Sequence, residues 1–230
     1  MNLYLLVEGE TEPRLYPDWL KILAPHMNRV DFIENINSNN FYIKGGLGYP
    51  GILDKDTGLK NTLSDISLNK KIDQLWIICD ADDCSIEDRE NEIRNRINEV
   101  LSSNNQLAIS HCDIHIIIQK VCIETWGLAN SRVFPTNNII PPFDKYANFY
   151  NVSVHDPELM PVPPNNQESI GEFHHQYLKN MLRARSNKIR YTKCNPSPLN
   201  KDFYLNEIIA RIGTNHCSSF KKFYDLALSL

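Results

Sequence analysis

The chain has 230 residues, a formal net charge of -4 and a hydrophobic fraction of 42%, with a mean hydropathy of -0.39. This composition is ordinary for a globular protein and allows one large domain, or one domain with an appendage. No segment reaches the roughly 18 uninterrupted apolar residues of a membrane helix. Glu8, Glu10 and Glu12 interrupt the region where a signal peptide needs an apolar core. We therefore expect a cytoplasmic protein that does not enter a membrane.

The cysteines favour the same compartment. The six residues, which form no CxxC pair, are Cys79, Cys84, Cys112, Cys122, Cys194 and Cys217. Several lie in or beside apolar runs, where a thiol behaves as a small hydrophobic group. This usage is typical of a reducing environment and argues against structural zinc.

Predicted strands and helices alternate along the first half of the chain. Apolar runs predict strands at residues 2–7, 29–36, 73–79 and 111–119, and apolar residues at helical spacing predict helices at 12–23, 52–68 and 85–101. The segment GGLGYPG, residues 45–51, lacks the Lys-Ser/Thr pair of a phosphate loop, so we expect a flexible loop. The alternation predicts an α/β fold with a mostly parallel sheet flanked by helices.

The second half differs in character. Residues 134–164 contain seven prolines and are expected to form a mostly irregular elaboration. Helices are expected at 167–185, 201–211 and 218–228. We therefore predict a core at 1–132, and a proline-rich elaboration with a helical C-terminal part, 133–230, packed on the same core.

Carboxylates follow three of the predicted strands. Glu8 and Glu12 come after the first strand, Asp80 and Asp82 after the strand ending at Cys79, and Glu124 after the strand ending near Gln119. The carboxyl ends of parallel strands meet at one edge of a sheet, where functional groups collect. Crowded carboxylates repel one another, and a hard cation such as Mg²⁺ or Mn²⁺ reverses this effect.

Each cluster also has a purely structural interpretation. Asp80 could open a turn, Asp83 or Ser85 could cap the next helix, and Glu124 could be an ordinary first-turn helix acid. The coincidence of three clusters favours the metal interpretation. The pair His174-His175 has no neighbouring ligand set and is expected on a helix surface.

The order of these motifs resembles the Toprim domain. Val7-Glu8-Gly9-Glu10-Thr11-Glu12, followed by Asp80-x-Asp82 and by Ile123-Glu124-Thr125-Trp126, is most similar to small Toprim proteins related to nucleases of the OLD family (overcoming lysogenisation defect). The resemblance covers about residues 2–130. It implies a Rossmann-like fold and a metal-dependent phosphodiesterase that acts in prokaryotic anti-phage defence.

The resemblance also implies roles for individual residues. Glu8, Asp80 and Asp82 match catalytic and metal-binding positions, Glu12 matches a second metal-binding glutamate, and Glu124 matches a later acidic residue that would also bind metal. The relatives use a basic residue beyond the core, for which Lys193 is the first candidate and Lys188 the second. The chain has no ATPase domain of its own, which implies a separate ATPase or other defence protein as a partner.

A basic segment supplies the expected nucleic-acid interface. Residues 179–201 carry seven Lys or Arg and no Asp or Glu, and Arg183, Arg185, Lys188, Arg190 and Lys193 are the predicted contacts. A solvated basic surface is the structural alternative. The sequence thus predicts a Mg²⁺- or Mn²⁺-dependent nuclease acting on DNA or RNA. The alternatives are a non-catalytic Toprim-like module that binds nucleic acid or a partner, and nucleotidyl or primer synthesis.

Overall fold

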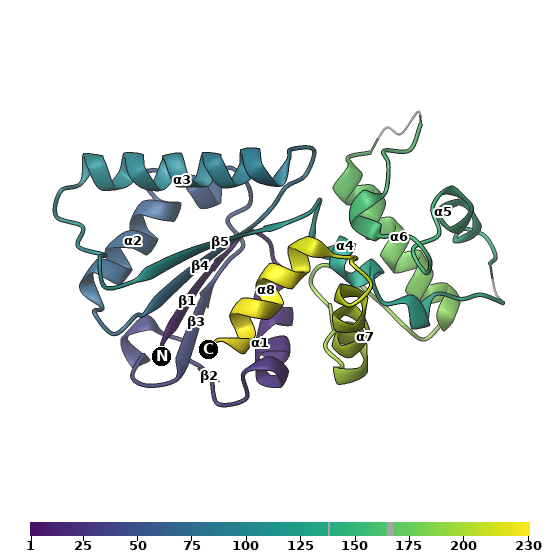
Figure 1. Ribbon diagram of the computed structural model, residues 1–230, viewed down its shortest axis with the longest axis horizontal. Coiled ribbons are helices and arrows are strands. Elements are labelled where there is room, and N and C mark those ends of the chain that lie inside the picture. The colour runs from purple at the N-terminus through teal and green to yellow at the C-terminus, as the bar shows by residue number, and fades with distance from the viewer. Residues whose placement is uncertain (138, 165–167) are drawn as a thin grey trace. The chain divides into compact units, whose positions relative to one another are not determined.

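A computed structural model describes residues 1–137, 139–164 and 168–230 (Figure 1). The chain divides into two compact units. The sheet unit comprises Met1–Cys79, Ser85–Ile118 and Ala227–Leu230, and the helical unit comprises Asp80–Cys84 and Gln119–Leu226.

A five-stranded, all-parallel sheet with the order β2-β3-β1-β4-β5 organises the fold. Its strands are Leu3–Val7 (β1), Asn28–Arg29 (β2), Asn40–Lys44 (β3), Gln74–Asp80 (β4) and Asp113–Gln119 (β5). Leu5 of β1 pairs with Ile43 of β3 on one side and with Trp76 of β4 on the other. The predicted α/β class with a mostly parallel sheet is confirmed.

The helices between the strands lie on both faces of the sheet. These are α1 (Glu12–Leu23), α2 (Gly58–Leu68) and α3 (Ile86–Ser103). Figure 1 shows α2 and α3 on one face and α1 on the other. From β1 the chain passes to the edge strand β2, returns inward to β3 and then crosses β1 to reach β4, so the direction of strand order reverses between β1 and β4. In open α/β sheets such a switch point, at the carboxyl ends of the strands, is where ligands bind.

Burial explains why the two central strands were predictable. Every residue of β1 is buried, and so are the five apolar residues 75–79 of β4. A strand covered on both faces has no polar alternation, and therefore reads as a continuous apolar run. The amphipathic helix α3 instead buries one stripe that includes Ile93, Ile97 and Val100.

The prediction of a strand at 29–36 is wrong. Only Asn28–Arg29 forms a short strand, Ile33–Asn35 is a 3-10 turn, and Phe32 is exposed. On this side of the sheet β1 pairs with β3, which buries only Phe41 and Ile43 in alternation. Five residues with two buried side chains give a weak pattern, which explains why β3 was missed.

The predicted helix 52–68 begins later than expected, at Gly58. The side chain of Asp54 accepts hydrogen bonds from the backbone N–H groups of Asp56 and Thr57, which closes a turn before α2. A Cβ added at Gly58 would lie 2.4 Å from the Gly51 carbonyl oxygen. The preceding 3-10 turn, Gly51–Leu53, therefore packs directly on the first residue of the helix.

The helical unit contains five α-helices among its described residues. They are α4 (Ile123–Leu128), α5 (Asp144–Phe149), α6 (Ile170–Arg185), α7 (Asp202–Ile212) and α8 (Ser218–Leu228). Of the predicted helix 167–185, Gln167 lies outside the described residues, and Ser169 caps α6 through the Glu172 N–H. The expected irregular stretch 134–164 contains α5. No helix among the described residues is both long and apolar enough to cross a membrane.

Aromatic packing forms the core of the helical unit. The ring of Trp126 lies 5.3 Å from Phe220 and 5.8 Å from Phe223, measured between centroids. The indole N–H of Trp126 donates to Ser219 Oγ at 2.7 Å, and Ser219 Oγ donates to the buried Glu158 at 2.5 Å. This core joins α4 to α8 and thereby holds the helix that carries Glu124.

Candidate functional site

The first acidic segment begins directly at the end of β1. The Glu8 N–H donates to the Ile78 carbonyl of β4 at 3.2 Å, which continues the sheet pairing for one residue. Glu8 is half-buried, and Glu12, the first residue of α1, is only 3% exposed. The strand therefore turns straight into the helix, and one of the two carboxylates is buried at this turn. Glu10, between them, is exposed.

A glycine at position 9 makes room for the buried carboxylate. A Cβ added at Gly9 would lie 2.5 Å from Glu12 Oε2, closer than atoms in real structures approach. The Glu12 side chain thus turns back over the backbone of the turn and occupies the space above Gly9. A hard cation needs such oxygen atoms held in place rather than dispersed in solvent.

The glycine-rich segment 45–51 lies against the same turn. The Gly48 N–H donates to the Glu8 carbonyl at 3.1 Å. A Cβ at Gly45 would lie 2.6 Å from Val7 Cγ2 and 2.7 Å from Pro13 Cγ. The segment expected to be only a flexible loop therefore supports the backbone of the acidic turn.

We expect Gly45→Ala to lower the free energy of unfolding by about 1–3 kcal/mol, since the added methyl group overpacks a site without space. Gly51→Ala is the matched control, because its nearest neighbour would be Leu47 Cβ at 3.9 Å. Urea denaturation of both variants measures the effect. Equal stability of the two variants would show that the loop can move away from Val7 without loss.

The second acidic segment belongs to the helical unit. The Ala81 N–H donates to the Gln119 carbonyl at 2.9 Å, and the Asp82 N–H donates to the Val121 carbonyl at 3.0 Å. Asp80 is half-buried and Asp82 is exposed. The Oδ1 atom of Asp82 lies 3.8 Å from the position that a Cβ would take at Gly171, in the first turn of α6.

Two residues of this arrangement have a left-handed backbone. Asp82 has φ = 49° and Val121 has φ = 66°. Aspartate tolerates this conformation, but it is costly for a β-branched residue such as valine. Strain of this kind persists only where the surroundings impose it, and it occurs preferentially at functional sites. The capping interpretation is confirmed for Ser85, whose Oγ accepts from the Asp88 N–H at 3.0 Å.

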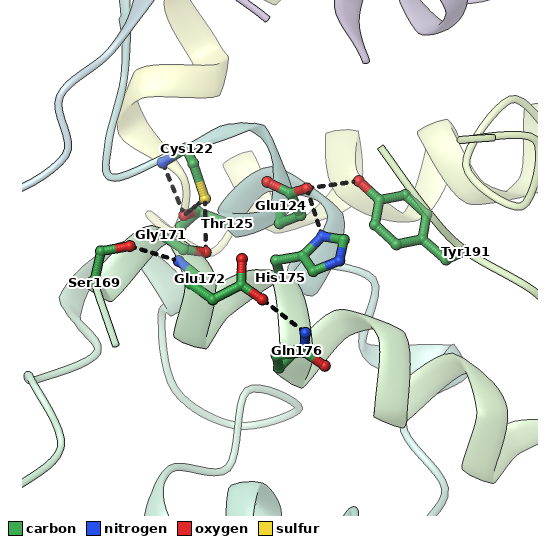
Figure 2. A network of polar contacts seen from close by, with 9 residues as sticks. All are labelled: Cys122, Glu124, Thr125, Ser169, Gly171, Glu172, His175, Gln176 and Tyr191. Carbon is green, nitrogen blue, oxygen red and sulfur yellow. Dashed lines mark hydrogen bonds and ion pairs between the residues drawn. The ribbon is translucent and has the colours of Figure 1, made fainter. Parts of the chain in front are cut away.

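Glu124 forms the centre of a buried polar network (Figure 2). It is 1% exposed and lies in the first turn of α4. Its Oε1 atom accepts a hydrogen bond from His175 Nδ1 at 3.0 Å and another from the Tyr191 hydroxyl at 2.9 Å. The predicted role of Glu124 as a metal ligand would therefore fall to its other oxygen, Oε2.

Electrostatics keep the Glu124 carboxyl ionised. Burial by itself would raise its pKa, but the hydrogen bond from His175 and the positive charge of Lys193 outweigh burial and lower the pKa below its ordinary value. The deeply buried acid is thus a fixed negative charge. A buried charge of this kind is stable only while its partners remain in place.

Lys193 lies near this network on an exposed turn. The turn is closed by a bridge between Thr192 and Asn195, two residues that flank Lys193 and Cys194. Partial shielding from water lowers the pKa of Lys193, but the carboxylates of Glu124 and Asp80 outweigh this and raise it. Because the hydroxyl of Tyr191 is bonded to Glu124, the network anchors the turn that carries this cation.

The expectation of a surface pair at His174-His175 is wrong, because both histidines are buried. Ile170, His174 and Leu178 are spaced by four residues and share the buried face of α6. This spacing could have revealed the burial of His174. His174 Nδ1 shares a hydrogen bond of 2.7 Å with Thr125 Oγ1, and burial lowers the pKa of His174 to about 4.

His175 and Tyr191 were missed as site residues. His175 adjoins a residue on the apolar face of its helix, and Tyr191 stands alone within a basic stretch. Neither shows a sequence pattern that links it to Glu124, which is 51 residues from His175 and 67 from Tyr191. Only folding brings these three side chains together.

The predicted nucleic-acid contacts are all exposed. Arg183 and Arg185 lie in the last turn of α6, and Lys188, Arg190 and Lys193 lie in the segment that follows. In the part of the chain that the structure describes, Arg183, Arg185, Lys188 and Arg190 have no carboxylate within ion-pair distance. Their positive charge is therefore available to a ligand.

The acidic side chains at the strand ends are hard oxygen donors of the type that Mg²⁺ and Mn²⁺ prefer. The carboxylate of Glu12, held over Gly9, fits such a cation. Across residues 1–137, 139–164 and 168–230, no group of three or more His, Cys, Asp or Glu side chains is gathered into a ready metal site. Glu8 and Glu12 belong to the sheet unit, whereas Asp80 and Asp82 belong to the helical unit.

Comparison of the chain with protein-family models, with curated proteins and with solved structures finds no significant match.

Proposed function

We propose that the protein is a metal-dependent nuclease that hydrolyses phosphodiester bonds in DNA or RNA. One observation carries the proposal. The parallel strands β1 and β4 pair as far as Val7 and Ile78 at the switch point of the sheet, and the first acid of each cluster follows within two residues of that pair. Acids concentrated at this position are expected where a cation and a phosphate are to be bound.

Glu8, Glu12, Asp80 and Asp82 are the residues that would hold the metal, with Glu124 as a further ligand through Oε2. When bound, Mg²⁺ or Mn²⁺ would polarise the phosphate and activate a water molecule. Lys193 offsets negative charge that develops on the scissile phosphate. The hydrogen bonds from His175 and Tyr191 hold Glu124 and, through Tyr191, keep the turn bearing Lys193 in position.

The resemblance of the motifs to Toprim proteins supports the same assignment. The parallel α/β sheet is the kind of fold that this resemblance implies. By the same resemblance, the proposed nuclease is an effector of prokaryotic anti-phage defence in the cytoplasm, and it acts with a separate ATPase or another defence protein. Contacts from Arg183, Arg185, Lys188, Arg190 and Lys193 would supply phosphate affinity that is independent of base sequence.

The test is a cleavage assay on labelled single- and double-stranded DNA and RNA. We expect cleavage with Mg²⁺ or Mn²⁺ and none with excess EDTA, with activity restored when the metal is added back. Cleavage that persists in EDTA contradicts the proposal. Metal-independent binding of nucleic acid without cleavage of any substrate would instead favour the non-catalytic module, and nucleotide incorporation would favour primer synthesis.

A further inference from the structure

A hollow with basic and apolar walls lies in the helical unit. Its volume is about 420 Å³, and it is formed by the end of α6, the segment that follows it and the start of α7. We call it the basic groove. The side chains that matter for its chemistry are Lys188, Ile189, Arg190, Pro198, Lys201 and Phe203.

The positive charge of the basic groove is not neutralised within the described chain. Lys188, Arg190 and Lys201 are exposed, and none has a carboxylate partner among the described residues. Arg190 donates to the carbonyl of Ile189 at 3.2 Å and also to that of Asn187, so its guanidinium is held by its own backbone. Among the described residues, no Asp or Glu lines the groove. Three such cations match a polyanion.

Most of the other residues that line the basic groove are apolar, and they include an aromatic ring open to solvent. Phe203 is 60% exposed, which is unusual for phenylalanine. Its ring centroid lies 6.3 Å from that of Tyr204, which is buried and whose hydroxyl donates to the Gly127 carbonyl at 2.7 Å. Phe203 thus lies beside an anchored ring at the start of α7 and exposes most of its own surface to solvent.

We propose that the basic groove binds unpaired nucleotides, and therefore that the substrate of the proposed nuclease is single-stranded nucleic acid. A base stacks on Phe203, and the flanking phosphates contact Lys188, Arg190 and Lys201. Stacking on an aromatic ring beside a line of cations is how proteins bind single strands without reading their sequence. In a duplex the faces of the bases are covered by their neighbours, and a purely acidic peptide such as poly-glutamate has charge but no flat ring to stack on Phe203.

The groove is linked to the proposed catalytic cation by the chain itself. The turn that carries Lys193 is formed by residues 192–195, and Asn195 also lines the groove. A strand bound between Arg190 and Lys201 is therefore held by the same segment that carries Lys193. The statement that the bound strand is a substrate rests on the proposed function, but binding of the strand can be measured without catalysis.

The experiment uses fluorescence anisotropy in EDTA, so that no cleavage occurs, with a labelled 12-nucleotide DNA, an RNA of the same sequence and the corresponding duplex. We expect the wild-type protein to bind the single strands at least about 10-fold more tightly than the duplex. Phe203→Ala should weaken single-strand binding by about 10-fold or more, and Phe203→Trp should retain it. Lys201→Ala should weaken binding and reduce its dependence on salt by about one phosphate contact.

Matched controls separate the groove from general surface effects. Leu159→Ala removes another apolar side chain that is 72% exposed, and Lys55→Ala removes an exposed cation of the sheet unit. Both should bind single strands like the wild type. Circular dichroism and thermal unfolding of each variant establish that it is folded.

Several results would overturn the inference. The first is that Phe203→Ala binds single strands as tightly as the wild type does. The second is that the wild type binds duplex and single strand equally well, or binds neither. The third is that poly-glutamate displaces the labelled oligonucleotide as effectively as unlabelled oligonucleotide does. The nuclease proposal is tested separately, by the cleavage assay. Selective single-strand binding without cleavage in Mg²⁺ contradicts only the nuclease, whereas cleavage without single-strand preference contradicts only the groove.

Discussion

Asp80→Asn is expected to reduce metal-dependent cleavage at least about 100-fold, and Glu8→Gln is expected to do the same. Each change replaces a carboxylate oxygen by an amide of nearly equal size, so it removes charge without removing volume. The loss of one charged ligand weakens metal binding and the stabilisation of the transition state, and about 2.7 kcal/mol of that stabilisation corresponds to 100-fold in rate. The measurement is the rate of oligonucleotide cleavage at saturating Mg²⁺.

The same loops supply matched controls. The control variants are Glu10→Gln, two residues after Glu8, and Asp83→Asn, three residues after Asp80. The side chains of Glu10 and Asp83 are both exposed. These variants should keep activity within about twofold, since neither residue belongs to the proposed metal site. If all four variants cut equally, the cleavage arises from another site or from a contaminant. If the controls lose as much activity as Asp80→Asn, the general charge of the loops matters rather than the two named ligands.

Lowering the pH from 7.5 to 5 is expected to destabilise the protein by about 2 kcal/mol through His174 alone. Burial lowers the pKa of His174 from 6.5 to about 4 in the folded state. As the pH falls through this interval, the unfolded chain takes up the proton before the folded chain does, so protonation favours unfolding. The stability associated with neutral His174 is therefore present above pH 6.5 and is lost progressively down to pH 4.

Urea denaturation at a series of pH values measures this effect. His174→Phe removes the titrating group while retaining a ring in the core, and it should flatten the pH dependence between 7.5 and 5. Proton NMR of the wild type gives an independent value, because the His174 ring should titrate near pH 4. Titration of that ring near 6.5 would mean that its burial does not resist protonation.

Much of the sheet unit could be predicted because its pattern is local. The helix at 12–23 begins and ends where expected, and the strands at 73–79 and 111–119 differ from β4 and β5 only at their ends. Continuous burial on both faces produces a long apolar run, and a helix packed on one face produces a regular stripe. By contrast, β3 has two buried side chains, and the start of α2 depends on contacts between Gly58 and an earlier turn.

The candidate site was only partly visible in the sequence. Two pairs of acids could be recognised, Glu8 with Glu12 and Asp80 with Asp82. The members of each pair are close in the sequence and follow a strand that the apolar pattern predicts. The partners of Glu124 could not be recognised, because hydrogen bonds from His175 and Tyr191 join residues that share no local pattern. Phe203 was missed for a related reason, since one exposed aromatic residue acquires significance only beside the cations that surround it.

By itself, the sequence determined the α/β class, the central strands and the acidic clusters that follow them, because burial and charge leave a local signal along the chain. The tertiary structure alone decided the strand order with its reversal between β1 and β4, the burial of His174 and His175, and the formation of the basic groove. These features depend on contacts between distant segments. The residues that make such contacts share no local pattern in the sequence from which the contact could be predicted.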